Sequence, residues 1–257
     1  MSLAELSAWQ WSVVGIAGLL AGFINTVAGG GSLLTLPALM LAGLPPTVAN
    51  GTNRIGILMQ SASATLQFRS AGALDLNLSG QLLWPTIMGA GLGAYTASVL
   101  SDAAMEPLIL SVLVTVALLF ALKPGWVAPS VGPKEAPRAP GAVTLVLMGL
   151  TGFYGGFLQA GVGFLLLTVL AGTLRLDLTR ANALKVALVV PYTLLALGIF
   201  AWADQVAWGV GIVLGATSML GARLGVYVAV ERSGWLRWLV LAAVVASGIA
   251  IALKRLS

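Results

Sequence analysis

Three basic residues lie inside otherwise apolar stretches of this chain. Arg54 follows "ANGTN" and Lys185 follows "ANAL", each roughly two turns into a long apolar segment. Arg223 stands in "GARLG", also roughly two turns from the end of its segment. A charge inside a membrane is costly and is a functional candidate by default, although long basic side chains can instead reach the headgroups. The cations therefore predict attraction of an anion, with anchoring at the membrane surface as the alternative.

Glycine clusters interrupt two of the apolar stretches. Gly29–Gly31 stand within Ala21–Met40, and "QAGVGF" covers Gln159–Phe164. A turn at membrane depth is tolerated only where it is buried in protein or faces a polar cavity. The helix beginning at Ser32, which can cap it, offers free N–H groups and a positive end that suit an anion. Two such breaks predict an anion site near the midplane.

Other glycines favour a different interpretation. Small residues let membrane helices approach closely, and for four of them this packing role is the preferred hypothesis. They are Gly22, Gly89, Gly93 and Gly152.

Neutral polar side chains near the breaks complete the candidate site. Hydroxyl and amide groups suit oxyanions, but each is equally able to form a hydrogen bond between helices. Thr26, Thr35, Gln60 and Tyr192 are weaker candidates of the same kind. The predicted substrate-binding residues are Asn25, Gly29, Gly30, Gly31, Ser32, Asn50, Thr52, Asn53, Arg54, Gln159, Gly161, Gly163, Asn182, Lys185 and Arg223.

Several kinds of chemistry lack the residues they need. The chain has no Cys and no His, so thiolate and imidazole metal sites and His-based catalysis are excluded. We expect no catalytic residues, no metal, no cofactor and no enzyme activity. A net charge of +5 over this length is not a nucleic-acid signature. The acidic residues fall at or near segment ends, which leaves no carboxylate for a mid-membrane proton relay; they include Asp75, Asp102, Glu106, Asp177 and Asp204.

The composition places these residues in a lipid bilayer. Of 257 residues, 59% are hydrophobic and 8% charged, and the mean hydropathy is +1.00, whereas a soluble domain has about 25% charged residues. A spanning helix needs roughly 20 apolar residues. The long candidates are 9–28, 48–68, 78–100, 105–122, 141–160, 178–200, 206–230 and 235–253, and the short ones 32–43 and 163–174.

The two halves of the chain resemble each other. "GAGLGAY" at Gly89 matches "GARLGVY" at Gly221, an offset of 132 residues, and Asn50 falls on Asn182 at the same offset. Chance recurrence in a chain rich in Gly, Ala and Leu is the alternative. The organisation is therefore an N-terminal repeat (1–122), a Pro-rich basic linker (123–140) and a C-terminal repeat (141–257).

The charges of the loops predict how the repeats are oriented. Lys and Arg concentrate on the cytoplasmic side of a membrane, and the basic and non-basic loops exchange places between the halves. Arginine occurs in loops 69–77, 174–180 and 231–237, and no Lys or Arg occurs in 43–47, 101–106 and 201–206.

This exchange predicts an all-α polytopic membrane protein built from two inverted repeats. Inversion needs an odd number of segments per half. Four long helices and one short helix that turns back after a glycine break satisfy that parity. The linker is then cytoplasmic and both termini are periplasmic, with Lys254 and Arg255 as poorly fitting residues on the outer side.

The stretch "GFINTVAGGGSLLTLPALMLAGLPPTVANGTN" resembles the signature of the TauE/SafE sulfite-exporter family. The second half resembles the family repeat at "GFYGGFLQAGVGFLLL", with Val162 where the usual glycine triplet is broken. The resemblance implies a bacterial inner-membrane transporter that exports sulfur-containing oxyanions such as sulfite, thiosulfate or sulfoacetate. The positions that match the signature are Gly22, Gly29, Gly30, Gly31, Pro37, Gly43, Pro45, Ala49 and Thr52.

Residues and resemblance together favour a transporter for small anions in the lipid bilayer. An anion channel on the same scaffold and a non-transporting assembly subunit are the alternatives. The sequence leaves the particular anion, the direction of transport, the coupling ion and the oligomeric state open.

Overall fold

The computed structural model describes residues 6–27, 30–122 and 138–231. Within these ranges the chain is helical and contains no strand. The predicted last segment, 235–253, and Gly29 lie outside the described residues. The helices are α1 (Ala8–Val27), α2 (Ser32–Leu41), α3 (Pro46–Ser70), α4 (Leu76–Ser98), α5 (Asp102–Leu122), α7 (Ala142–Phe157), α8 (Val162–Leu174), α9 (Leu178–Trp202) and α10 (Trp208–Glu231).

Local signals in the sequence explain where these helices begin. Pro46 occupies the first position of α3, where a missing N–H costs nothing. The side chains of Asp75 and Asp177 accept hydrogen bonds from Leu78 N and Arg180 N and so cap α4 and α9. Each predicted segment within the described ranges corresponds to one helix, and both short runs are separate helices.

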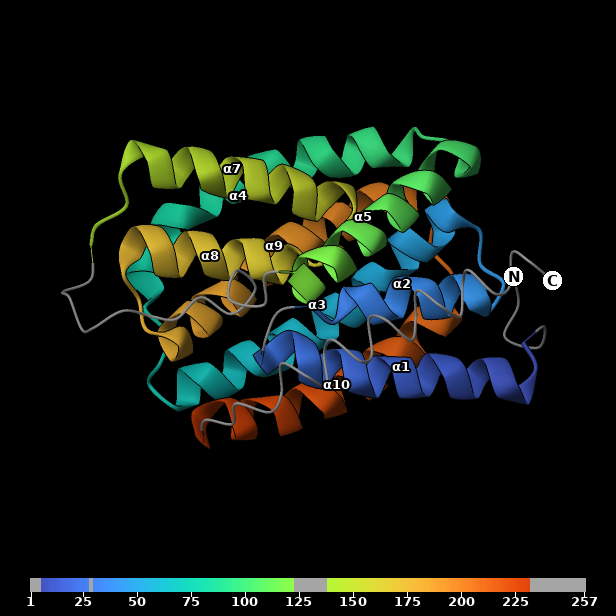
Figure 1. The fold of residues 1–257 in the computed structure, drawn as a ribbon, viewed down its shortest axis with the longest axis horizontal. Coiled ribbons are helices and arrows are strands. Elements are labelled where there is room, and N and C mark those ends of the chain that lie inside the picture. Colours follow the sequence, from blue (N-terminus) through green and yellow to red (C-terminus); the bar gives the residue numbers. More distant parts are fainter. Residues whose placement is uncertain (1–5, 28–29, 123–137, 232–257) are drawn as a thin grey trace.

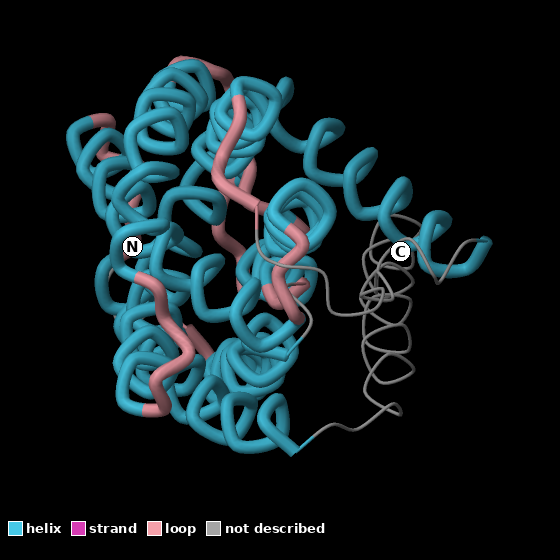
Figure 2. The backbone as a smooth tube through the Cα atoms, turned by 90° about the vertical axis from the view of Figure 1, so that its left-hand side faces the viewer, coloured by secondary structure: helices cyan, strands magenta, loops and turns pink. Residues whose placement is uncertain are grey.

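The helices pack in the same pairs in both halves. The first helix of each half lies along the fourth helix of the other: α1 packs on α10, and α7 packs on α4. Helices α3 and α9 pack on each other between these pairs (Figure 1). Seen along the long axis, the helices appear end on as neighbouring rings (Figure 2).

Helices α1 and α7 run in opposite directions along the long axis (Figure 1). This is the relation that inverted repeats require. The inverted repeat stays a prediction, because the segment that would complete the second half lies outside the described residues.

The molecule is apolar on its surface and polar at its centre. Trp84, Met88 and Leu92 on α4 are each at least 65% exposed, whereas Asn53 and Arg54 on α3 are fully buried. A water-soluble protein shows the opposite pattern for charged groups. Three described helices are long and apolar enough to cross a membrane by length and composition: Ala8–Thr26, Leu178–Trp202 and Trp208–Val226.

Glycines form the two seams between the halves. A Cβ on Gly22 of α1 would lie 1.9 Å from the Ser218 carbonyl oxygen of α10. A Cβ on Gly152 of α7 would lie 2.2 Å from the Thr86 oxygen of α4. Gly89 and Gly93 approach the backbone of α7 as closely. The predicted packing role of these four glycines is therefore confirmed.

Replacing Gly22 by Ala should destabilise the protein by about 1–3 kcal/mol, because the new methyl group meets backbone that cannot move aside. Gly198→Ala on α9 is the matched control, since no atom lies within 4 Å of its Cβ position, and Ala is the better helix former by about 1 kcal/mol. Thermal melting of the purified protein measures both changes. Equal melting temperatures for Gly22→Ala and wild type would contradict the tight seam.

Candidate functional site

The two helix breaks meet at the centre of the molecule. The Ser32 hydroxyl, at the start of α2, donates a hydrogen bond to the Gln159 carbonyl oxygen (2.8 Å) and accepts one from Gly161 N (3.3 Å). A Cβ on Gly30 would lie 2.6 Å from the Phe164 ring of α8. The expectation that Ser32 caps its own helix is wrong, because Gly31 is the N-cap residue and no side chain caps α2. The hydroxyl instead joins one break to the other.

The second break depends on unusual backbone angles. Gln159 and Gly161 have φ values of 67° and 71°, a region that non-glycine residues seldom occupy. The Tyr154 hydroxyl donates to the Ala160 oxygen (2.5 Å) and helps to hold this turn. Gly163, predicted as part of the break, is instead in the first turn of α8. The second break therefore comprises residues 158–161.

Arg54 holds the end of the helix that precedes this second break. Its Nη1 donates to the Gly155 oxygen (2.5 Å) and to Gln159 Oε1 (2.6 Å). Its Nη2 donates to the Gly156 oxygen (2.8 Å) and Asn50 Oδ1 (3.2 Å). The last carbonyls of a helix lack intrahelical partners and carry negative partial charge, so a cation from the first half stabilises α7 of the second.

Neighbouring side chains extend the Arg54 network. Asn50 Nδ2 donates to the Phe157 oxygen (2.8 Å), the last carbonyl of α7. Gln159 Nε2 donates to the Tyr192 hydroxyl (3.1 Å). The guanidinium carbon of Arg54 lies 5.1 Å from the centre of the Phe200 ring, a cation–π contact. One guanidinium thus links α3, α7 and α9.

Lys185 makes the corresponding contact from the second half of the chain to the first. Its Nζ donates to the Asn25 carbonyl oxygen near the end of α1 (2.7 Å) and to Asn182 Oδ1 (2.8 Å). Gly155, which accepts from Arg54, follows Asn25 by the same number of residues as Gly152 follows Gly22. Asn25 and Gly155 are therefore at equivalent positions in the two halves. Each half thus sends one cation to an equivalent carbonyl of the other half.

Neither cation has a carboxylate partner in the part of the chain that the structure describes. Arg54 is 0% and Lys185 1% exposed, and the acidic residue Asp177 pairs instead with Arg180 at the surface (3.5 Å). Burying a charge without a counter-charge is costly even when it is hydrogen-bonded. Arg54 and Lys185 are therefore two buried basic side chains that neutral oxygens solvate and that no described acidic residue balances.

Two donors beside these charges have no acceptor among the described residues. They are Asn53 Nδ2 and Arg54 Nε. Asn53 is fixed through its oxygen, which accepts a hydrogen bond from the Thr35 hydroxyl (2.5 Å). Unsatisfied donors in a buried position cost about 1–3 kcal/mol each. An anion with several oxygen acceptors would satisfy both.

The remaining predicted residues lie elsewhere. Thr52 Oγ1 accepts a hydrogen bond from Ala207 N (2.9 Å) and fixes the loop before α10. Arg223 is exposed on α10, so the structure does not bring it to the two buried cations. Phe164 and Phe200 contact the centre but were missed, since an aromatic residue in an apolar helix carries no sequence signal.

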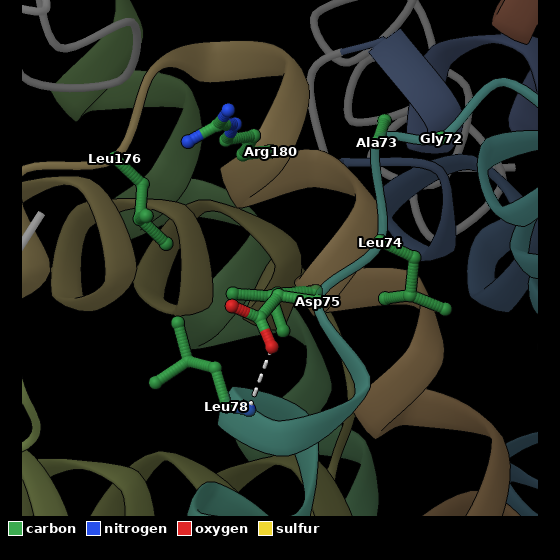
Figure 3. Close-up of a pocket in the computed structure, with 8 residues that line it drawn as sticks. Gly72, Ala73, Leu74, Asp75, Leu78, Leu176 and Arg180 are labelled. Carbon is green, nitrogen blue, oxygen red and sulfur yellow. Dashed lines mark hydrogen bonds between the residues drawn. The ribbon is translucent and has the colours of Figure 1, made fainter.

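A separate cavity of about 210 Å³ lies away from the breaks, at the ends of α3 and α8. Figure 3 shows Asp75 at this cavity bonded to Leu78 N (3.0 Å), with Arg180 on the other side. None of the predicted site residues lines it. The cavity is therefore not the candidate site.

Comparison with known proteins identifies the family. The profile of the family described as "Sulfite exporter TauE/SafE" matches residues 14–251. A probable membrane transporter protein, ORF9, of Sinorhizobium sp is 31% identical over 210 residues, which cover 82% of this chain and 79% of the relative.

Two further relatives have similar names. A probable membrane transporter protein of Haemophilus influenzae is 30% identical, covering 81% of this chain and 80% of the relative. The probable membrane transporter protein YfcA of Escherichia coli K12 is 29% identical, covering 87% and 82%. No solved structure gives a significant match. With its apolar surface, its broken helices and this match over most of its length, the chain belongs to the TauE/SafE sulfite exporter family of membrane transporters.

Proposed function

We propose that this protein exports small sulfur-containing oxyanions, such as sulfite, thiosulfate or an organosulfonate like sulfoacetate, across the bacterial inner membrane. The observation that carries the proposal is the pair of buried cations, Arg54 and Lys185, without a carboxylate partner in the described residues. In this proposal the substrate anion supplies the negative charge that balances these cations. Family membership supports transport, and the name of the family supports a sulfur anion.

The chemistry of the centre suits such an anion. A sulfur oxyanion presents several oxygen acceptors around one compact charge, and Asn53 Nδ2 and Arg54 Nε are donors without acceptors. Helices α2 and α8 begin at the two breaks, and the N-terminus of a helix carries positive partial charge. Charge, donors and helix ends thus favour the same class of ligand.

The packing of the halves supports an alternating-access mechanism. Ser32 joins the two breaks through one hydroxyl, and Arg54 and Lys185 each cross from one half to the other. When one half rocks against the other, these contacts must break on one side of the site. Arrival of an anion would weaken them, because it competes with the carbonyl oxygens for the same cations.

Sulfite, thiosulfate or sulfoacetate should raise the melting temperature of the purified protein, and labelled substrate should enter proteoliposomes with saturable kinetics. A ligand that binds only the folded state stabilises it by mass action, and a site with one anion saturates. Sodium chloride at equal ionic strength is the control. Flux that rises without saturation, at rates far above those of transporters, would indicate a channel. No binding and no flux for any sulfur anion would contradict the proposal and favour a non-transporting subunit.

Lys185→Gln should reduce labelled sulfite flux at least about tenfold, because a hydrogen bond to a charged group is worth roughly 1.5–3 kcal/mol. Glutamine still carries a donor for the Asn25 oxygen, so the folded protein should persist. Arg69→Gln is the matched control, since it removes a basic charge from the exposed end of α3. Wild-type flux in Lys185→Gln would remove Lys185 from the site.

Arg54→Lys should also lose most of the flux while keeping the positive charge. A lysine ammonium donates from a single nitrogen and lacks the planar fork with which the guanidinium bonds to Gly155, Gly156 and Gln159 together. Melting temperature separates lost positioning from lost folding. Unchanged half-saturation and maximal rate would show that the forked geometry is dispensable.

A further inference from the structure

Two polar residues of α3 are buried without a function in the centre described so far. Gln60 is 3% and Ser61 1% exposed. Gln60 Oε1 and Ser61 Oγ have no hydrogen-bond partner among the described residues. Buried polar side chains nearly always have a partner, and those that lack one need an explanation. An apolar residue at either position would be cheaper for a protein that had only to fold.

These residues lie on the continuation of the candidate site along α3. Gln60 and Ser61 follow Asn53 by seven and eight residues, a spacing that places all three on one side of a helix, about two turns apart. The row of polar groups therefore continues from the Arg54 centre toward the other end of α3.

Apolar clusters shared by α3 and α9 flank Gln60 and Ser61 on one helix and Lys185 on the other. Ile57, one turn before Ser61, shares an apolar cluster with Leu184 and Leu188 of α9. Ala64, one turn after Gln60, shares another with Ala183 and Val186. Lys185 lies between these residues of α9, as Gln60 and Ser61 lie between those of α3.

The repeat gives an independent reason to pair them with a cation. At the offset that relates Asn50 to Asn182, Gln60 falls on Tyr192 and Ser61 on Thr193. Tyr192 already belongs to the Arg54 network, because its hydroxyl accepts from Gln159, whose oxygen accepts from Arg54. Tyr192 and Thr193 are both fully buried. The predicted repeat therefore pairs Gln60 and Ser61 with the other cation, Lys185.

We propose that Gln60 and Ser61, together with Lys185, form a second station for the sulfur oxyanion on the cytoplasmic side of the Arg54 centre. The Ser61 hydroxyl and the Gln60 amide donate to oxygens of the anion, and Gln60 Oε1 accepts from water that accompanies it. The substrate passes between two cations in turn instead of resting at one. This inference depends on the proposed anion transport and adds the residues of its inner half.

The test compares Gln60→Leu and Ser61→Ala with wild type in proteoliposomes loaded with labelled sulfite, and in thermal melting. Thr86→Val is the matched control, because the Thr86 hydroxyl is buried but donates to the Leu82 oxygen of its own helix (2.7 Å). Each α3 variant should raise the half-saturating sulfite concentration about tenfold, because it removes one hydrogen bond to a charged group. Its melting temperature should stay equal or rise, because an unsatisfied buried group has been removed.

The outcomes separate the two proposals. Wild-type half-saturation in both variants, with normal flux in wild type and control, would overturn the second station and leave anion transport standing. A lower melting temperature with unchanged half-saturation would also overturn it, since that is the signature of a purely structural role. Absence of flux for sulfite, thiosulfate and sulfoacetate alike in the wild-type protein would overturn anion transport and the second station together.

Discussion

The structure depends on how two positive charges are kept inside an apolar molecule. Arg54 and Lys185 are solvated by the carbonyl ends of interrupted helices and by amide oxygens, with no carboxylate among the described residues in reach. A continuous helix has no carbonyls to spare at its middle. The breaks between α1 and α2 and between α7 and α8 therefore supply the carbonyl oxygens that offset the cost of burying the cations. The cations in turn give those carbonyls hydrogen-bond partners.

This reciprocity explains why the two halves are linked through their centre. Each cation belongs to one half and its carbonyl partner to the other, and Ser32 of the first break bonds to backbone of the second. The contacts are polar, few and placed between bodies that otherwise meet through small residues. Such an arrangement allows one set of contacts to be exchanged for another when the solvation of the cations changes, which a packed apolar interface does not.

Much of the fold could be predicted from the sequence, because apolar runs, proline positions and capping aspartates are local signals. Both short helices were predicted from the glycine clusters. Charge inside an apolar run is informative by itself: Arg54 bonds to Gln159, and Lys185 bonds to the Asn25 oxygen of the other half, while their role as a binding site stays a prediction. The partners of those residues could not be predicted. Which helices cross decides that Ser32 bonds to Gln159 and that Thr52 fixes a loop. The sequence does not distinguish these roles, because a serine or threonine hydroxyl can serve in either. Arg223 looked similar to Arg54 in sequence and differs only in the face of the helix that carries it.

The glycine seams have a consequence for how the chain can be divided. Helix α1 is packed along α10 and α7 along α4, with backbone against backbone at Gly22 and Gly152. A repeat released by cutting the linker would keep its own α2 and α3 or α8 and α9, but its first helix would turn a bare strip of glycine backbone toward lipid. The two predicted repeats are therefore halves of one folding unit, because neither covers the glycine face of its own first helix.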